Sequence, residues 1–201
     1  MKSVPPKPTE LGRRTLLAIG AASVFVAGRG SQAAERLKIS GSRGTIDFAI
    51  GDSKIFRTTG GFKDWQGTVH VDDEDVPRST VEVIVRTGSV SMLDNQQTAM
   101  LKDPDFFHVE KFPEMTFRST RIERTGESTL RVVGDITLRG ITRPMTLDVS
   151  VTDRRPNAAP GTRYAGFRAK GTIKRSEFGM TKFVDVVGDT VEISINADAW
   201  R

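Results

Sequence analysis

Apolar and polar residues alternate along most of the chain from Arg36 onward, which is the pattern of β-strands that bury one face. Within a run the apolar side chains keep one parity, as Ile46, Phe48 and Ile50 do in GTIDFAIG. Helical periodicity is nearly absent from the same region. Comparable runs lie at 69–71, 81–85, 115–117, 130–138, 145–151, 167–173 and 191–199, and together with KIFRTTG they predict eight or nine strands.

Clusters of glycine, proline and aspartate separate these runs at short spacing. Short connections favour antiparallel pairing between successive strands. One segment departs from the alternation: MLDNQQTAMLK, residues 92–102, predicts a single helix with Ser91 or Asp94 as its N-cap and Pro104 as its stop. No internal repeat or second-domain boundary is visible, so the chain predicts one all-β domain.

Eight or more antiparallel strands with one short helix fit either a β-sandwich or a closed barrel, because both architectures protect strand edges. Alternation does not choose between them. Strand length favours the barrel, since the runs at 129–139 and 164–175 exceed the usual length of about five or six residues. A barrel of about eight strands is either just filled by its side chains or wide enough for one ligand.

Residues 1–33 have the features of an export signal rather than of a folded segment. Arg13 and Arg14 precede a moderately apolar run of fourteen residues, and small residues lead to Ala33, after which we expect cleavage. The run is shorter than the roughly 20 residues that span a bilayer, so we expect no stable membrane insertion after its removal. The arginine pair resembles a twin-arginine signal, with the ordinary secretory route as the alternative. Residues 34–201 are then an exported, periplasmic domain.

The positive charge of the chain is concentrated in that leader. It contains five of the 30 Lys and Arg residues and one of the 25 Asp and Glu residues, which leaves 25 basic and 24 acidic residues in 34–201. The net charge falls from +5 to about +1, and the composition then predicts no nucleic-acid partner. The chain has no cysteine, which excludes disulfides and thiolate-based metal or catalytic sites.

Few residues are candidates for a metal site or a catalytic site. There are two histidines, so the chain cannot build a three-histidine site, and His70 alternates with valines that face the other way. A mixed site of His108 with Asp105 or Glu110 competes with the simpler interpretation of an exposed loop histidine. The acidic cluster at 72–75 lacks the spacing of a calcium loop and is typical of a solvated turn. No serine elbow or particular carboxylate pair stands out. We predict a protein that is not an enzyme and has no metal or cofactor.

Two glycine-containing blocks are best interpreted as turns. RSEFGM predicts a turn in which Gly179 adopts the left-handed backbone and Phe178 folds inward. GDITLRGITRPMTLDV predicts two strands around a hairpin at 140–144.

Several separated blocks resemble the YceI-like family of bacterial polyisoprenoid-binding periplasmic proteins. These blocks are TIDFAI, TTGGFKDWQGTVHVD, DPDFFHVEKFPEMTFRST, VVGDITLRGITRPMTLDV, GTIKRSEFGMTKF and VGDTVEISINADA, in this order between residues 37 and 199. The resemblance implies a single lipocalin-like antiparallel barrel with an elongated apolar interior for an isoprenoid chain, and no known catalytic residue set. One block departs from the family: QTAML at 97–101 replaces a charged Arg-Asp-x-His-Leu stretch, which weakens any head-group contact from that place.

The predicted partner is therefore a long apolar lipid of polyprenyl or quinone type, bound by inward-facing side chains. The alternative is a solid-cored secreted β-domain that has no lipid pocket and acts through surface interactions in a stress response. Phe106 and Phe107 lie between the helix and the next strand, where we expect one ring to enter the barrel and the other to pack under the helix. The oligomeric state stays open, a dimer included. The remaining candidate ligand contacts, each of which has core filling as its alternative role, are Phe48, Phe62, Trp65, Phe117, Ile136, Leu138, Met145, Leu147, Phe167 and Ile173.

Overall fold

The computed structural model of the protein describes residues 1–2, 35–51, 57–155 and 159–201. The predicted export signal falls almost entirely on residues outside this set. Across the described residues, no helix is both long and apolar enough to cross a membrane. The account below concerns the folded unit that ends at Arg201.

Strands dominate the described part of the chain, as the alternation predicts. The helices are α1 (Asn95–Lys102) and α2 (Val184–Val187), and the 3-10 turns are η1 (Gly41–Arg43), η2 (Val76–Arg78), η3 (Thr87–Ser89) and η4 (Arg175–Phe178). The strands are β1 (Glu35–Ser40), β2 (Gly44–Ile50), β3 (Thr58–Phe62), β4 (Trp65–Val71), β5 (Thr80–Arg86), β6 (Val90–Met92), β7 (Glu114–Arg124), β8 (Thr129–Leu138), β9 (Ile141–Thr152), β10 (Arg163–Lys174) and β11 (Thr190–Trp200).

The strands close into one antiparallel barrel. Hydrogen bonding runs in the order β1-β4-β5-β7-β8-β9-β10-β11, and β1 pairs with β11 to complete the circle. The short strands β2, β3 and β6 continue β1, β4 and β5 beyond a bend, because β2 pairs with β11 and β3 while β3 pairs with β6. Eight bent strands result, so the prediction of an eight-stranded lipocalin-like barrel is confirmed and the sandwich is wrong.

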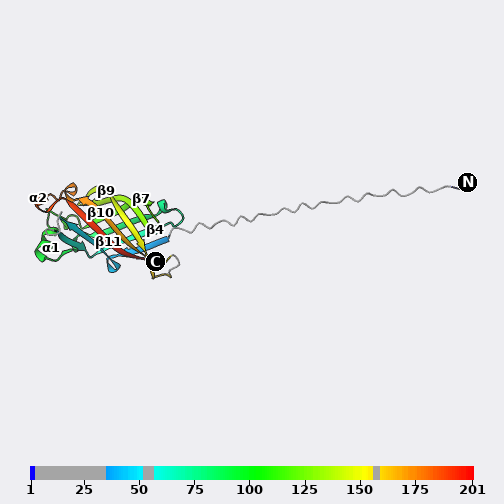
Figure 1. The fold of residues 1–201 in the computed structure, drawn as a ribbon, viewed down its shortest axis with the longest axis horizontal. Coiled ribbons are helices and arrows are strands. Elements are labelled where there is room, and N and C mark those ends of the chain that lie inside the picture. The colour runs from blue at the N-terminus through cyan, green and yellow to red at the C-terminus, as the bar shows by residue number, and fades with distance from the viewer. Residues whose placement is uncertain (3–34, 52–56, 156–158) are drawn as a thin grey trace. The chain divides into compact units, whose positions relative to one another are not determined.

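The two ends of the barrel are built differently. At one end lie α1, α2 and the β8–β9 hairpin, and at the other lie the connections β4–β5, β7–β8 and β9–β10. We call the first, with α1 and α2, the helix end, and the second, with the three strand connections, the hairpin end. Figure 1 shows α1 and α2 at the same end and the C-terminus at the opposite one. Among the described strands β6 pairs with β3 alone, and the chain from α1 to β7 follows at that edge.

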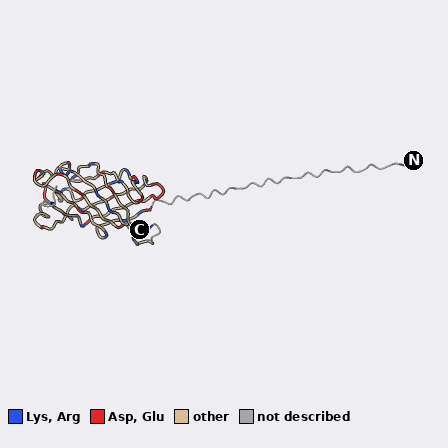
Figure 2. Tube along the Cα trace, in the orientation of Figure 1, with Lys and Arg blue, Asp and Glu red and all other residues tan. Residues whose placement is uncertain are grey.

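Basic and acidic residues are interspersed along the strands of the barrel, as Figure 2 shows, and the charged side chains of the cross-strand pairs are exposed. Cross-strand neighbours form ion pairs there: Arg118 Nε lies 3.2 Å from Glu82 Oε1, and Arg131 Nε lies 3.2 Å from Asp148 Oδ1. Exposed pairs of this kind each contribute about 0–1 kcal/mol. They help to set strand register, while the inward apolar side chains drive the burial that stabilises the fold.

The helix and the RSEFGM turn follow their sequence signals. Asp94 is the N-cap, and its Oδ1 accepts a hydrogen bond of 2.8 Å from the Gln97 N–H. The helix begins at Asn95 rather than Met92, because Met92 pairs with Gly60 in the sheet. In the turn, Gly179 has φ 75° and Phe178 is fully buried, so both parts of that prediction are confirmed.

Candidate functional site

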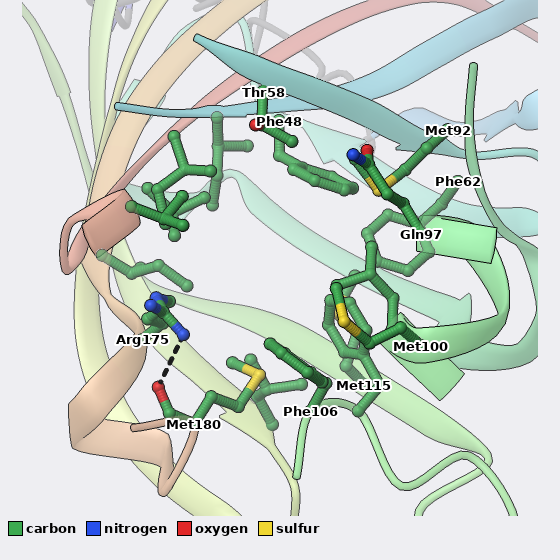
Figure 3. A pocket seen from close by; sticks show the side chains of 18 of the residues that line it. Phe48, Thr58, Phe62, Met92, Gln97, Met100, Phe106, Met115, Arg175 and Met180 are labelled. Carbon is green, nitrogen blue, oxygen red and sulfur yellow. Dashed lines mark hydrogen bonds between the residues drawn. The ribbon is translucent and has the colours of Figure 1, made fainter. Parts of the chain in front are cut away.

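Within the described part of the barrel, the interior has two cavities with mainly apolar linings. The cavity at the hairpin end has a volume of about 560 Å³, and the cavity at the helix end, shown in Figure 3, has about 210 Å³. Ligand pockets in proteins span roughly 300–1,000 Å³. The hairpin-end cavity alone is therefore large enough for a ligand, whereas the helix-end cavity suits only part of one.

Four side chains separate the two cavities and line both of them. Ile46 of β2, Met115 of β7, Ile136 of β8 and Ile193 of β11 form this boundary, which we call the waist. Three of them are isoleucines and one is methionine, so none has a strong hydrogen-bonding group. A ligand that fills both cavities must pass between them, so the waist sets the girth of any chain that runs the length of the barrel.

Glycines on neighbouring strands allow two aromatic rings to lie against the barrel wall. A Cβ at Gly60 would collide with the ring of Phe48, and a Cβ at Gly134 would lie 2.6 Å from Phe117 Cζ. A strand glycine commonly marks such a close approach. At Gly60 the Phe48 ring would have to move, whereas at Gly134 a Cβ would also lie 2.4 Å from the Arg118 carbonyl oxygen, so the strand backbone would have to shift as well. Glycine at these two positions thus lets both rings lie close to the wall.

All twelve candidate ligand contacts from the sequence line one of the cavities. Whether any of them touches a ligand stays a prediction. Ile136 lies at the waist and lines both cavities. Those in the helix-end cavity are Phe48, Phe62, Phe106, Phe107, Leu138 and Ile173, and those in the hairpin-end cavity are Trp65, Phe117, Met145, Leu147 and Phe167.

Phe106 and Phe107 both line the helix-end cavity, so the expectation that only one ring would enter the barrel is wrong. The expectation assumed an extended chain, in which successive side chains alternate. The chain turns here instead, with the N–H groups of Phe106 and His108 both bonded to the Asp103 carbonyl. The Phe107 ring packs edge-on against Phe62 at 5.4 Å between centroids, which covers part of the cavity with aromatic surface.

Arg175 is the residue of this site that sequence reasoning missed. It is 6% exposed and lies on the wall of the helix-end cavity (Figure 3). Its Nε donates to the Gly188 carbonyl at 2.9 Å, and its Nη1 donates to the carbonyls of Met180 at 3.1 Å and Lys182 at 2.6 Å. Burial lowers the pKa of Arg175, which the charge of Asp189 opposes. A charged residue in a turn gives no parity signal, so only the folded loop reveals its position.

Further apolar side chains, which the sequence analysis did not predict, also line the helix-end cavity. Met92, Met100 and Met180 come from β6, α1 and the β10–β11 connection, and Phe183 and Val187 come from α2 and the residue before it. Methionine adapts to ligands of irregular shape. None of these positions belongs to a long alternating run, so the strand pattern did not include them.

A polar cluster of Asp73, Arg154 and Tyr164 lies at the hairpin-end cavity. Arg154 forms an ion pair with Asp73, and the buried Tyr164 hydroxyl donates to Asp73 Oδ2 at 3.2 Å. Burial raises the pKa of Tyr164. Burial would lower the pKa of Arg154, but its contacts with Tyr164 and Asp73 outweigh this and raise it. Asp73 is thus engaged with the barrel rather than only solvated.

Two other candidates for metal binding, Asp72 and His108, make contacts within the fold. Asp72 Oδ1 accepts the N–H groups of Glu74 at 3.2 Å and Asp75 at 2.9 Å, which stabilises the β4–β5 turn. His108 packs edge-on against Phe112 at 5.8 Å between ring centroids. In the part of the chain that the structure describes, no group of three or more His, Cys, Asp or Glu could hold a metal ion.

The sequence matches known proteins over nearly its whole folded part. The model of the family described as YceI-like domain matches residues 37–199. A UPF0312 protein of Yersinia pestis (strain Pestoides F) is 31% identical over 186 residues, which cover 92% of this chain and 96% of the relative. A UPF0312 protein of Yersinia enterocolitica is 31% identical over 189 residues, which cover 94% and 97%.

Solved structures share the barrel at lower sequence identity. BcnA of Burkholderia cenocepacia superposes with a TM-score of 0.69 at 22% identity, over 80% of this chain and 98% of that one. The YceI protein of Campylobacter jejuni gives 0.66 at 23%, over 76% and 90%. A polyisoprenoid binding domain from Saccharophagus degradans, implicated in plant cell wall breakdown, gives 0.58 at 12%, over 83% and 98%. Likeness at these identities shows a common fold.

Proposed function

Since the chain belongs to the YceI-like domain family, we propose that it binds a long apolar lipid of isoprenoid type inside its barrel and carries it. The observation that supports this most is the hollow interior, with cavities of about 560 and 210 Å³ on either side of the waist. The Saccharophagus degradans domain, described as polyisoprenoid binding, has the same fold and adds support.

The energetics of such binding are favourable. Burying a CH₂ group contributes about 0.8 kcal/mol, and a chain of several isoprene units offers many such groups. Association costs roughly 4–15 kcal/mol in lost freedom of motion. A long chain therefore exceeds this cost by burial alone, and the protein selects its ligand by length and girth more than by hydrogen bonds. Binding and release of this kind need no catalytic group.

We place this activity in the periplasm. The proposal rests on residues 1–33, whose paired arginines, apolar run and small residues before Ala33 fit a twin-arginine export signal. Residues 34–201 then act as a barrel domain that shields an apolar chain from water. The solid-cored alternative, acting through its surface, is disfavoured because the barrel interior is not filled by side chains.

The test is to produce the full chain with its leader, purify it from the periplasm without detergent, and analyse an organic extract by mass spectrometry. We expect an isoprenoid lipid at close to one molecule per protein. The proposal fails if repeated preparations contain no such lipid and if polyprenyl and quinone lipids leave the melting temperature unchanged.

A further inference from the structure

Arg175 has hydrogen-bonding capacity that the fold does not use. Its Nε and one of its terminal nitrogens, Nη1, are occupied by the carbonyls of Gly188, Met180 and Lys182. The other terminal nitrogen, Nη2, has no acceptor among the residues that the structure describes. The Arg175 side chain lies on the cavity wall (Figure 3), and the residue as a whole is 6% exposed. Two N–H donors of a buried cation are therefore available to a ligand.

The charge of Arg175 also lacks a direct counter-ion. Its three acceptors are neutral carbonyls, and no described carboxylate lies within 4.0 Å of it. The nearby Asp189 carboxylate is occupied by Ser176, whose N–H donates at 2.8 Å and whose hydroxyl donates at 2.7 Å. Lys182 of the same cavity is paired with Asp105 at 2.5 Å. Burying a charge without a partner is costly, so an anionic ligand group at Nη2 would be stabilising.

Among the described residues that line the cavity at the opposite end, no charged side chain is buried as Arg175 is. Arg154 lies at the hairpin-end cavity, but Asp73 neutralises it and Tyr164 occupies a further donor at 3.4 Å. The larger cavity is lined mainly by apolar side chains, which suit a hydrocarbon chain, and its other charged lining residues, Asp72, Arg124 and Glu127, are not buried. The smaller cavity, at about 210 Å³, has room for a head group and the first part of a chain.

Building on the proposed function, we propose that Arg175 Nη2 binds the acidic head group of an amphiphile, a phosphate or carboxylate oxygen, while its chain passes the waist into the hairpin-end cavity. Guanidinium groups favour these oxygens because the hydrogen bonds are charge-assisted and match in geometry. The proposal gives the ligand a direction in the barrel and favours acidic isoprenoid lipids over neutral ones such as quinones.

The first experiment compares ligands with one chain and three heads on the wild-type protein. Geranylgeranyl phosphate, geranylgeranoic acid and geranylgeraniol share a C20 chain and differ in the phosphate, carboxylate or hydroxyl that ends it. We expect at least one acid to bind about tenfold or more tighter than the alcohol, equivalent to about 1.4 kcal/mol. The tighter of the two acids identifies the head-group class.

The outcomes separate the two proposals. Equal affinity for all three ligands overturns the head-group proposal and leaves lipid binding in place. If none of the three binds, and longer polyprenyl lipids also fail, the proposed function itself is wrong.

Variants then locate the preference. Arg175→Gln removes the charge and should reduce the acid-to-alcohol ratio to about threefold or less, whereas the matched change Arg154→Gln at the other end should leave it near tenfold. The ratio is the readout because a loosened β10–β11 loop weakens all three ligands alike. An unchanged ratio in Arg175→Gln, or a loss of the ratio in Arg154→Gln alone, overturns the assignment.

A measurement on the wild-type protein covers the case in which Arg175→Gln does not fold. The side-chain Nε–H signal of Arg175, assigned through its backbone by NMR, should shift on addition of the acid that binds more tightly and stay in place with geranylgeraniol. An identical response to acid and alcohol contradicts the proposal.

Discussion

The two ends of the barrel differ in whether their arginine side chain is paired with a carboxylate. At the hairpin end, Arg154 is paired with Asp73 and bonded to Tyr164, so the cation is neutralised by the protein itself. At the helix end, Arg175 is more deeply buried and has only backbone carbonyls as partners. Arg154 therefore stabilises the fold at the hairpin end, whereas Arg175 keeps unused N–H donors at Nη2. The comparison suggests that the hairpin end is structural and the helix end receives the polar part of a ligand.

The difference arises in the connections rather than in the strands. At both ends the wall consists of apolar residues that alternate along the strands. Each end also has a phenylalanine ring packed against a strand glycine. The connections β4–β5 and β7–β8 at the hairpin end contain no α-helix, whereas the helix end has α1 and, in the β10–β11 connection, α2. These connections add Met100, Met180 and the charged Arg175 to the interior, beyond the apolar residues that strand alternation places there.

The largest effect should come from closing the waist. Ile136→Trp places a bulky ring between the two cavities, so a chain cannot extend from one into the other. We expect the affinity for a long polyprenyl lipid to fall on the order of a hundredfold, about 2.7 kcal/mol, in a titration followed by calorimetry. A lipid short enough for one cavity should lose far less.

The matched control is Ile84→Trp, on a strand of the same barrel and partly exposed at 37%. It should leave the affinity for both lipids unchanged. Undiminished binding of the long lipid by Ile136→Trp would show that the chain does not pass the waist, and the comparison of the two ends would lose its basis.

An intermediate effect is expected from the two glycines. Gly134→Ala should push the Phe117 ring into the hairpin-end cavity and also displace the backbone at the Arg118 carbonyl, and Gly60→Ala should push the Phe48 ring into the helix-end cavity. Overpacking of this kind costs about 1–3 kcal/mol of unfolding free energy, measurable by urea denaturation. Gly134→Ala should weaken binding of the chain, while Gly60→Ala should mainly reduce the preference for an acidic head.

Gly88→Ala serves as the control, because a Cβ at Gly88 meets no atom within 4 Å. Its unfolding free energy should stay within about 0.5 kcal/mol of the wild type. If the variants at Gly60 and Gly134 behave like this control in stability and in binding, the rings do not keep the interior open.

The smallest effect should follow from Tyr164→Phe at the hairpin end. The hydroxyl is buried and bonds to Asp73, so its loss should lower the unfolding free energy by about 1 kcal/mol. The change should not alter the acid-to-alcohol ratio, because the cluster is structural. A reduced ratio in Tyr164→Phe would move the head-group site to the hairpin end.

The barrel and its inward residues could be predicted because alternation carries both strand position and facing. The strand candidates such as Phe48, Ile136 and Leu147 keep the parity of their runs, and the structure places them at a cavity. The Asp94 cap and the Gly179 turn follow from local backbone chemistry and are also visible in the sequence.

The rest depends on contacts between distant segments. Arg175 enters the wall only because the carbonyls of Met180, Lys182 and Gly188 surround it, which requires the whole β10–β11 connection to be folded. The turn at Asp103 similarly brings both Phe106 and Phe107 inward, which a local rule for extended chain contradicts. Whether the interior is hollow depends on volumes summed over all strands.

The most direct test of the account is a crystal structure of the protein purified from the periplasm with its native ligand. We predict continuous electron density for one chain that begins at the guanidinium of Arg175, passes between Ile46 and Ile136, and ends in the hairpin-end cavity. An interior filled by its own side chains, or a ligand whose polar group lies beside Arg154, would contradict it.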